Sequence, residues 1–457
     1  MSKIQSINPA TDEIVGAVSC SSTDEVNASY KSARRALTDW RYRPVSERVV
    51  GVESLLQRIK ANEQELVNLV TLETGKTVTQ SQSEFDGTIA KVQWLLDVAS
   101  ESLAPETLDI SDTQITKMYK EPYGVIAAIA PWNFPISQFM HNTVQNVLCG
   151  NTVVFKHSEE CALVGELLEK IVAESDLPSG VITFVHGDGH VGQILIGQNI
   201  DKLCFTGSSK VGMELYKQAS ERFIPVTFEL GGSSPGIIFE DADLNIVLND
   251  ACKERFNACG QVCCALKRLI VHESIFEEVA SRLAEKIESL VVGDPTKPST
   301  EIGPLVAKRQ QEALSDQVEN ALESGAKALV GGEPVQGMSG AFFSPTLLTN
   351  VTTDMAVWQE EVFGPVLPMI SFSTEEEAVE LANDTAYGLS AFVYSSDQER
   401  ALRVARRIDA GQVATNATSY FSANASFGGF KKSGIGRHRG RYGFYEATQP
   451  KVISEPV

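Results

Sequence analysis

Residues 152–185 read TVVFKHSEECALVGELLEKIVAESDLPSGVITFV. The stretch opens with an apolar, β-branched run, Thr152–Lys156, which is typical of a buried strand. A helical pattern follows from about Glu160 to Glu174, and a second strand-like run covers Val181–Val185. Strand, helix and strand in this order and at these lengths predict a parallel β-sheet with crossover helices.

The same alternation continues on the C-terminal side of this stretch. Lys202–Phe205 and Pro225–Glu229 read as strands, and Thr206–Ser209 leads into a helix between them. After Gly231 and Gly232 the alternation resumes. It predicts helices near Leu244–Asn257, Ile275–Leu290 and Ala401–Ile408, and strands at Leu269–His272 and Gln412–Thr415. We therefore expect an α/β fold with parallel sheets in two halves that divide near Gly232.

The N-terminal part of the chain shows a different pattern of apolar residues. Residues 24–104 show helical spacing of apolar positions, for example over Val49–Val70. Residues 108–119 alternate, with Ile110, Ile115 and Tyr119 among them, and predict a β-hairpin that has no core of its own.

Composition excludes several classes of function. The 457 residues carry a net charge of −20, which repels phosphate backbones and anionic lipid, so we expect neither a nucleic-acid nor a membrane partner. No run approaches the roughly 18 apolar residues of a membrane helix. Because the N-terminal MSKIQSINPATDEIVG lacks an apolar core, we expect a cytoplasmic protein.

The cysteines predict neither disulfides nor a metal site. There are eight of them and no secretion signal, so a disulfide framework is not expected. Cys259, Cys263 and Cys264 cluster, but no histidine or further cysteine follows at ligand spacing. We therefore predict no metal.

Two motifs carry residues suited to covalent or acid–base chemistry, and each leaves two interpretations open. A cysteine in 256–264, FNACGQVCC, is either a thiolate nucleophile on a glycine-bearing loop or a small buried side chain. Glu229, in FELGG, is either a structural ion-pair partner or a base with a raised pKa.

Three further motifs are equally ambiguous when taken alone. The turn FTGSSKVG (205–212) either binds a pyrophosphate at a helix N-terminus or only caps that helix. Asn133, in APWNFP, either completes a turn or donates to an oxyanion. The segment EEVFGP (360–365) has a solvated turn as its plain interpretation.

Taken together, APWNFP, VVFKHSEE, FTGSSKVG, FELGGSSP, GQVCC, EEVFGP and FGGFKKSG, in this order, resemble the NAD(P)-dependent aldehyde dehydrogenase superfamily. The resemblance extends from Asn8 to about Ile453, and the 34 residues from Glu229 to Cys263 fit the family spacing. The short N-terminus and LKRLIVH (266–272) are similar to the compact succinate-semialdehyde dehydrogenases. The substrate class implied is a small aldehyde, with succinate semialdehyde favoured over other aliphatic or aromatic aldehydes.

The resemblance implies a role for each matching residue. Cys263 matches the nucleophile, Glu229 the general base and Asn133 the oxyanion donor. The cofactor contacts implied are Trp132, Lys156, Glu159, Gly187, Phe205, Gly207, Ser208, Val211, Leu230, Glu361 and Phe363. Glu159 near the adenosine ribose favours NAD, with NADP as the alternative. The chain departs from the family pattern at His157 and Ser426, where proline is common.

The resemblance also implies a domain plan and an assembly. Residues 1–103 and 123–231 form an NAD-binding domain, 232–430 a catalytic domain, and 104–122 with 431–457 an oligomerisation element that builds a homodimer or homotetramer. Two other classes compete with this reading. A CoA-acylating dehydrogenase has no need of Glu229, and a silent binding protein has no need of Cys263, Glu229 and Asn133 together.

Overall fold

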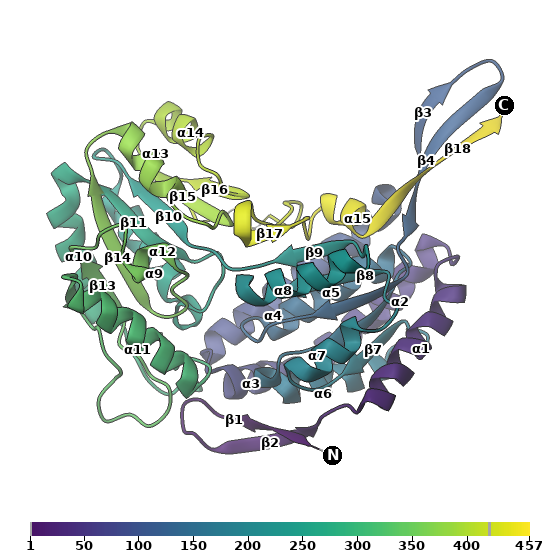
Figure 1. Cartoon of the computed structure of the whole chain (residues 1–457), viewed down its shortest axis with the longest axis horizontal. Helices are drawn as coiled ribbons and strands as arrows, with labels where there is room; N and C mark the ends of the chain where they lie inside the picture. Colours follow the sequence, from purple (N-terminus) through teal and green to yellow (C-terminus); the bar gives the residue numbers. More distant parts are fainter. Residues whose placement is uncertain (1, 419–421) are drawn as a thin grey trace.

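The computed structural model describes residues 2–418 and 422–457 as two α/β lobes beside each other, with a thin β-arm that projects from one of them (Figure 1). The expected α/β class with parallel sheets is confirmed. Residues 419–421, inside the predicted catalytic segment 232–430, lie outside the described residues, and the division into domains stays a prediction.

The first lobe is built on a six-stranded sheet of order β17-β9-β8-β5-β6-β7. Its strands are β5 (Val125–Ile129), β6 (Thr152–Lys156), β7 (Ile182–Val185), β8 (Lys202–Thr206), β9 (Val226–Glu229) and β17 (Gly434–Ile435). Only β17 is antiparallel to its neighbour. From β5 the chain builds outward to β6 and β7, and then returns to add β8 and β9 on the other side. This reversal opens a crevice at the carboxyl ends of β5 and β8, where ligands bind in such sheets.

Helices bury both faces of this sheet. One face packs α1 (Thr23–Trp40), α7 (Gly189–Ile196) and α8 (Ser209–Glu221), as the apolar cluster of Val26, Leu195 and Leu215 shows. The other face packs α2 (Val45–Ala61), α3 (Glu63–Thr74), α4 (Val78–Ser102), α5 (Pro135–Leu148) and α6 (Ala162–Ala173). Strands covered on both faces are continuously apolar, which is why 152–156 was readable as a strand.

The second lobe holds a seven-stranded sheet of order β12-β13-β14-β11-β10-β15-β16, parallel except for β12. The strands are β10 (Ser234–Ile238), β11 (Leu266–His272), β12 (Lys327–Val330), β13 (Thr346–Thr349), β14 (Val366–Phe372), β15 (Ser390–Tyr394) and β16 (Gln412–Thr415). Its helices are α9 (Leu244–Phe256), α10 (Phe276–Glu288), α11 (Lys308–Glu323), α12 (Ala356–Gln359), α13 (Glu375–Asn383) and α14 (Gln398–Ala405).

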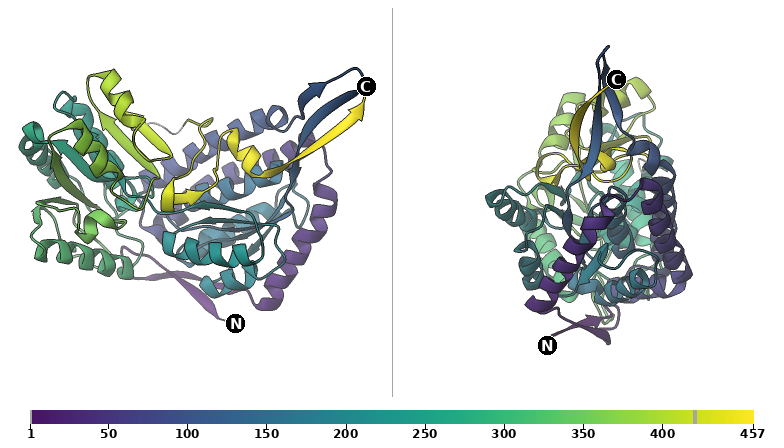
Figure 2. Two further views of the ribbon diagram at one scale, coloured as in Figure 1. Left: turned by 45° about the horizontal axis from the view of Figure 1, so that its top comes forward. Right: turned by 90° about the vertical axis from the view of Figure 1, so that its right-hand side faces the viewer.

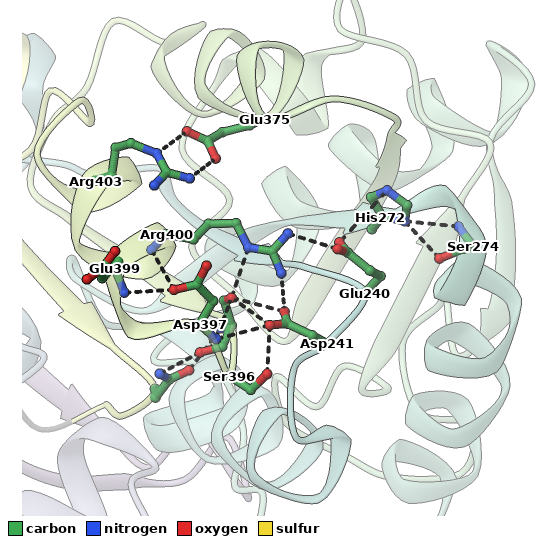
Figure 3. Close-up of polar contacts among 12 residues, drawn as sticks. Glu240, Asp241, His272, Ser274, Glu375, Ser396, Asp397, Glu399, Arg400 and Arg403 are labelled. Atoms are coloured by element: carbon green, nitrogen blue, oxygen red, sulfur yellow. Dashed lines mark hydrogen bonds and ion pairs between the residues drawn. The ribbon is translucent and has the colours of Figure 1, made fainter.

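Ion pairs lie at the carboxyl edge of this second sheet (Figure 3). Arg400 of α14 donates to Glu240 at 2.8 Å and lies 2.5 Å from Asp241, both just after β10. Burial acts to raise the pKa of Asp241, but hydrogen bonds from Ser396 and Asp397, together with Arg400, outweigh it and lower the pKa to about 2. The strands β10 and β11 begin at the opposite, amino edge.

The arm consists of β3 (Glu106–Ile110), β4 (Gln114–Pro122) and β18 (Thr448–Pro456). The C-terminal strand pairs with β4 along its whole length, from Thr448↔Pro122 to Pro456↔Gln114, and Figure 2 shows the arm standing clear of both lobes. Ile110 is 68% exposed and Val452 59% exposed. The hairpin expected at 108–119 is present, and its lack of a core is plain in this exposure.

The remaining elements are short. They are the N-terminal hairpin β1 (Lys3–Ile7) and β2 (Ile14–Ser19), α15 (Tyr442–Glu446), and the 3₁₀ turns Glu159–Cys161, Asn257–Gly260, Glu273–Ile275 and Lys431–Ser433. In the part of the chain that is described, no helix is long and apolar enough to cross a membrane.

Candidate active site

The site lies where the carboxyl edge of the first sheet meets the amino edge of the second. Glu229 ends β9, and only residues 230–233 separate it from the start of β10. The backbones approach closely here, because a Cβ on Gly232 would lie 2.5 Å from the Cys263 carbonyl oxygen. A Cβ on Gly231 would lie 2.2 Å from Glu361 Oε2. The two glycines of FELGG are thus required by space, and they bring Glu229, Cys263 and Glu361 to one place.

A strained loop presents Cys263. Ala258, Cys259 and Gly260 follow one another in the left-handed region, with φ of 49°, 55° and 73°. Such backbone persists only where its surroundings fix it. Arg255, fully buried, donates to the carbonyl oxygens of Gly260 and Val362 at 3.3 Å each, and it also bonds Gly364. This arginine holds the loop through backbone carbonyl oxygens, and no motif in the sequence pointed to it.

Accessibility separates Cys263 from the other thiols. Cys20 and Cys263 are partly exposed, whereas the remaining six cysteines, Cys259 and Cys264 included, are buried. The adjacent Cys264 thiol and burial raise the pKa of Cys263, while the Lys267 ammonium acts to lower it. Of the cysteines in 256–264, only Cys263 is accessible enough for a reactive thiol.

Glu229 is a buried carboxyl with little to hold it. It is 5% exposed, and neither carboxylate oxygen accepts a hydrogen bond of ordinary geometry in the described part of the chain, although the His438 backbone N–H is near enough to act to lower its pKa. Burial, and next the nearby Cys263, raise the pKa of Glu229 well above its ordinary value, against the opposing effect of Arg439 and Arg437. Glu229 forms no salt bridge with a described residue, so the structure does not support the interpretation of this glutamate as an ion-pair partner. Its buried position beside Cys263 is one in which a base with a raised pKa would lie.

Asn133 follows β5 in the loop that leads into α5, and it is 6% exposed. Its Nδ2 donates to the backbone oxygen of Gln261 at 2.9 Å, two residues before Cys263. One amide proton therefore remains for another acceptor on the cysteine side. The structure brings the three predicted catalytic side chains together from three separate segments.

Lys267 was not singled out from the sequence. It lies on β11, 1% exposed, where its ammonium bonds Glu361 Oε1 and donates to Gly232 O at 2.9 Å. It also lies 5.1 Å from the centre of the Phe363 ring, which meets Trp132 edge-on at 5.8 Å. The segment EEVFGP is therefore no solvated turn at Glu361, since this carboxylate is held by a buried cation. In the sequence, the one sign of this buried cation was a pair of basic residues, Lys267 and Arg268, within the otherwise apolar run LKRLIVH.

The other predicted cofactor residues line the carboxyl edge of the first sheet. Lys156 ends β6, is 3% exposed, and has Glu159 Oε2 at 4.0 Å. Ser208 caps α8 by accepting from Val211 N–H at 3.3 Å. Leu230 packs on this helix, close enough that a Cβ on Gly212 would lie 2.5 Å from it.

Two glycines at this edge are required by close packing. A Cβ on Gly207 would lie 2.5 Å from the Phe205 ring, and one on Gly187, at φ 154°, would lie 2.2 Å from Val191. The N-terminus of α8 at the same edge suits a pyrophosphate, and Lys156 with Glu159 offers a donor and an acceptor to a ribose. These residues fit a nicotinamide dinucleotide.

The structure explains one of the two departures from the family pattern. His157 is buried, with Nε2 3.1 Å from Pro135 O and Nδ1 3.2 Å from the Cys161 thiol, and burial lowers its pKa to about 3. The Ser426 carbonyl accepts from Gln412 Nε2 at 2.9 Å, a bond that a proline carbonyl would also accept, so only the His157 side chain is explained by its contacts.

Comparison with known proteins agrees with this geometry. The profile of the Aldehyde dehydrogenase family matches residues 1–453. A peroxisomal aminoaldehyde dehydrogenase 1 of Pisum sativum is 36% identical over 99% of this chain and 92% of its own. A succinate-semialdehyde dehydrogenase [NADP(+)] of Deinococcus radiodurans is 34% identical over 98% and 94%. The crystal structure of Staphylococcus aureus betaine aldehyde dehydrogenase with NAD+ superposes with a TM-score of 0.96, at 32% identity over 99% and 91%. Since one relative is peroxisomal, the cytoplasmic location stays a prediction.

Proposed function

This chain belongs to the aldehyde dehydrogenase family and is an NAD(P)-dependent aldehyde dehydrogenase, and we propose that Cys263, Glu229 and Asn133 carry its reaction. One observation supports the proposal above all. A partly exposed thiol, Cys263, shares one small site with Glu229, a buried carboxyl that forms no salt bridge or hydrogen bond of ordinary geometry with a described residue. Buried carboxyls with a raised pKa beside a thiol are typical of sites of acid–base chemistry.

Cys263 attacks the aldehyde carbon in the first step. A carbon–sulfur bond forms, and the π electrons of the carbonyl move to oxygen. The free amide proton of Asn133 and the Cys263 backbone N–H donate to that oxyanion. A preorganised donor of this kind is worth about 3 kcal/mol.

The nicotinamide, when bound, accepts the hydride that leaves the former aldehyde carbon. The chain's own part is to hold this ring against Cys263. Trp132 and Phe363 pack edge-on beside the site, and Glu361 would accept hydrogen bonds from the ribose hydroxyls of a bound cofactor. Lys267 fixes Glu361 for that task, because its ammonium and the Gly232 N–H both bond Oε1.

Glu229 acts on the thioester that remains on Cys263. It takes a proton from a water molecule, whose oxygen attacks the acyl carbon, and the carbon–sulfur bond then breaks to return the thiolate and release a carboxylic acid. This step separates the proposal from a CoA-acylating enzyme, which transfers the acyl group to a thiol and needs no base for water.

For the substrate we favour succinate semialdehyde. Two observations support this choice: the sequence resembles the compact succinate-semialdehyde dehydrogenases, and one relative is a succinate-semialdehyde dehydrogenase. The named relatives offer opposite charges, an amino-bearing aldehyde and a carboxylate-bearing one. Another small aliphatic or aromatic aldehyde is the alternative. We favour NAD as the cofactor because Glu159 lies beside Lys156 at the end of β6.

The exposed arm supports a homodimer or homotetramer. Its outer strands β3 and β18 each have one edge that pairs with no other described strand, and they carry exposed apolar residues such as Ile110 and Val452. Unprotected edges of this kind pair with another chain.

The test is oxidation of an aldehyde panel with NAD and NADP, followed through the absorbance of the reduced nicotinamide. Cys263→Ala should abolish the reaction, whereas Cys264→Ala should keep most of it. Loss of activity only in the Cys264 variant would contradict the assignment. A wild-type protein that reduces no cofactor with any aldehyde would identify a silent binding protein.

A further inference from the structure

A buried ion pair contacts the segment that follows Asn133. Lys76 lies in the turn between α3 and α4, and Glu84 lies in the second turn of α4. Their side chains are 2% and 1% exposed, and Lys76 Nζ lies 2.5 Å from Glu84 Oε2. Taking two charges out of water costs about as much as their attraction returns, so such a pair adds little stability beyond that of apolar side chains of the same volume. Its contacts with the proposed site indicate another role.

Glu84 supplies the N-terminal cap that α5 lacks. Phe134 precedes the helix and offers no side-chain acceptor, and Pro135, the first helical residue, has no N–H. The next two N–H groups, those of Ile136 and Ser137, donate to Glu84 Oε1 at 2.9 and 3.0 Å. In most helices the side chain of the residue before the helix satisfies such groups. The start of α5 is therefore fixed to α4 by this one carboxylate.

Lys76 contacts the same segment through an aromatic ring. Its ammonium lies 3.9 Å from the centre of the Phe134 ring, within the range of a cation–π contact. Phe134 packs against the same apolar cluster as Cys263, a cluster that includes Val262. Lys76 therefore holds the ring that connects the Asn133 segment to the loop of the nucleophile.

The turn that carries Lys76 is itself fixed to the second lobe. Gly75 ends α3 in the left-handed region, with φ of 71°, and a Cβ there would lie 2.6 Å from Pro304. Val78 N–H donates to Pro295 O at 2.8 Å. Both prolines lie in the connection between α10 and α11. The ammonium is thus placed relative to the lobe that supplies the nucleophile, as well as to the first lobe.

We propose that Lys76 and Glu84 are positioning residues, which hold Asn133 so that its remaining amide proton points at the oxyanion formed on the aldehyde. The inference rests on the proposed function, which makes Asn133 the oxyanion donor. A preorganised donor is effective only at the place where the charge develops, and a small displacement costs much of its effect. Glu84 fixes the helix that follows Asn133, and Lys76 fixes the ring of the next residue. The hydrogen bond from Asn133 Nδ2 to Gln261 O, 2.9 Å long, completes the arrangement.

A double-mutant cycle separates positioning from stability. Lys76→Met is compared in the wild type and in Asn133→Ala, at saturating cofactor, through kcat/KM for the best aldehyde of the panel. In the wild type we expect Lys76→Met to lower kcat/KM about tenfold, mostly through kcat. In Asn133→Ala, where the amide is already removed, the loss should be less than twofold.

The matched control for this variant is Lys202→Met. Lys202 is also buried, with 2% exposed, and its ammonium lies 4.6 Å from the centre of the Tyr123 ring. It lies at the amino end of β8, away from the proposed site. Lys202→Met should therefore change kcat/KM by the same factor in the wild type and in Asn133→Ala.

A second variant keeps the test decisive if Lys76→Met does not fold, because breaking a buried pair destabilises a protein. Lys76→Met/Glu84→Gln removes both charges and keeps an acceptor for the two N–H groups of α5. It should lower kcat/KM about three- to tenfold in the wild type and less than twofold in Asn133→Ala. Glu73→Gln is its control, since Glu73 is 1% exposed and accepts two N–H groups at the start of α6 at 2.9 and 2.8 Å. Any loss in this control should be equal in both backgrounds.

Equal losses in the two backgrounds for a folded Lys76→Met, or for the double variant, would overturn the inference, because a purely structural pair acts independently of Asn133. Unchanged kcat/KM in the folded variants would overturn it as well. Failure of the proposed function looks different. Asn133→Ala alone would then lose less than about threefold, leaving no oxyanion donor to position, or no aldehyde would reduce the cofactor.

Discussion

Glu159 is expected to set a preference for NAD over NADP, and Glu159→Ser should narrow that preference. The residue begins the 3₁₀ turn after β6, with its side chain 41% exposed and Oε2 4.0 Å from Lys156 Nζ. A carboxylate beside the adenosine ribose accepts from the 2′-hydroxyl of NAD and repels the 2′-phosphate of NADP.

The geometry sets the size of the effect. One pair of like unit charges about 4 Å apart costs about 4 kcal/mol at an effective dielectric of about 20. Two features reduce this figure, because the Glu159 carboxylate is 41% exposed to water and the buried Lys156 ammonium attracts the same phosphate. A remainder of about 1–2 kcal/mol corresponds to roughly a 5- to 30-fold preference for NAD in kcat/KM.

The assay measures kcat/KM for both cofactors at a saturating aldehyde concentration. Glu166→Ser is the control, since Glu166 is an exposed acid on the adjoining helix α6. Glu159→Ser should bring the ratio of kcat/KM with NAD to kcat/KM with NADP close to one, and Glu166→Ser should leave that ratio unchanged. Equal use of the two cofactors by the wild type, or no response to Glu159→Ser, would show that this carboxylate only begins the turn, where its charge suits the helix dipole.

Three further outcomes follow from the site. Glu229→Gln should release about one reduced nicotinamide per site in a burst and then turn over about 10²- to 10⁴-fold more slowly, and a slow first turnover without a burst would contradict its place in hydrolysis. Burial raises the pKa of the Glu229 carboxyl in the folded protein above its value in the unfolded chain. The free energy of unfolding therefore falls as the pH rises from the unfolded-state pKa through the folded-state pKa. Glu229→Gln should remove that loss and raise the alkaline Tm, whereas equal melting curves at high pH would mean that the carboxyl is solvated. Asn133→Ala should lower kcat/KM about 100-fold, and a loss below about threefold would exclude an oxyanion contact.

The sequence predicted strands best where a strand is uniformly apolar. The strand expected at Thr152–Lys156 has those bounds in the structure, because it is buried on both faces. The strand expected at Leu269–His272 begins earlier, at Leu266. Lys267 and Arg268 concealed its start, since two cations do not read as buried strand. The fold accommodates Arg268 through hydrogen bonds to backbone oxygens, including that of Ser233 at 3.0 Å.

Local pattern also could not show which distant segments meet. The hairpin at 108–119 was readable from its alternation, but its partner strand β18 lies more than 300 residues away along the chain. Motifs located the proposed chemistry because the nucleophile and the base lie in short, glycine-marked turns.

Glu229 and Cys263 lie together because the first sheet faces the site with its carboxyl edge and the second sheet with its amino edge. The first sheet ends its strands at the site, so β9 delivers Glu229 and β8 delivers Gly207 from its carboxyl edge. The second sheet begins its strands there, and the ion pairs of Arg400 with Glu240 and Asp241 lie at its opposite, carboxyl edge. The Cys263 loop therefore comes before β11 and not after a strand, and left-handed backbone at 258–260 is what turns it toward the first sheet. Residues 230–233 fix the spacing, because a side chain on Gly232 would push the Cys263 carbonyl away from the base.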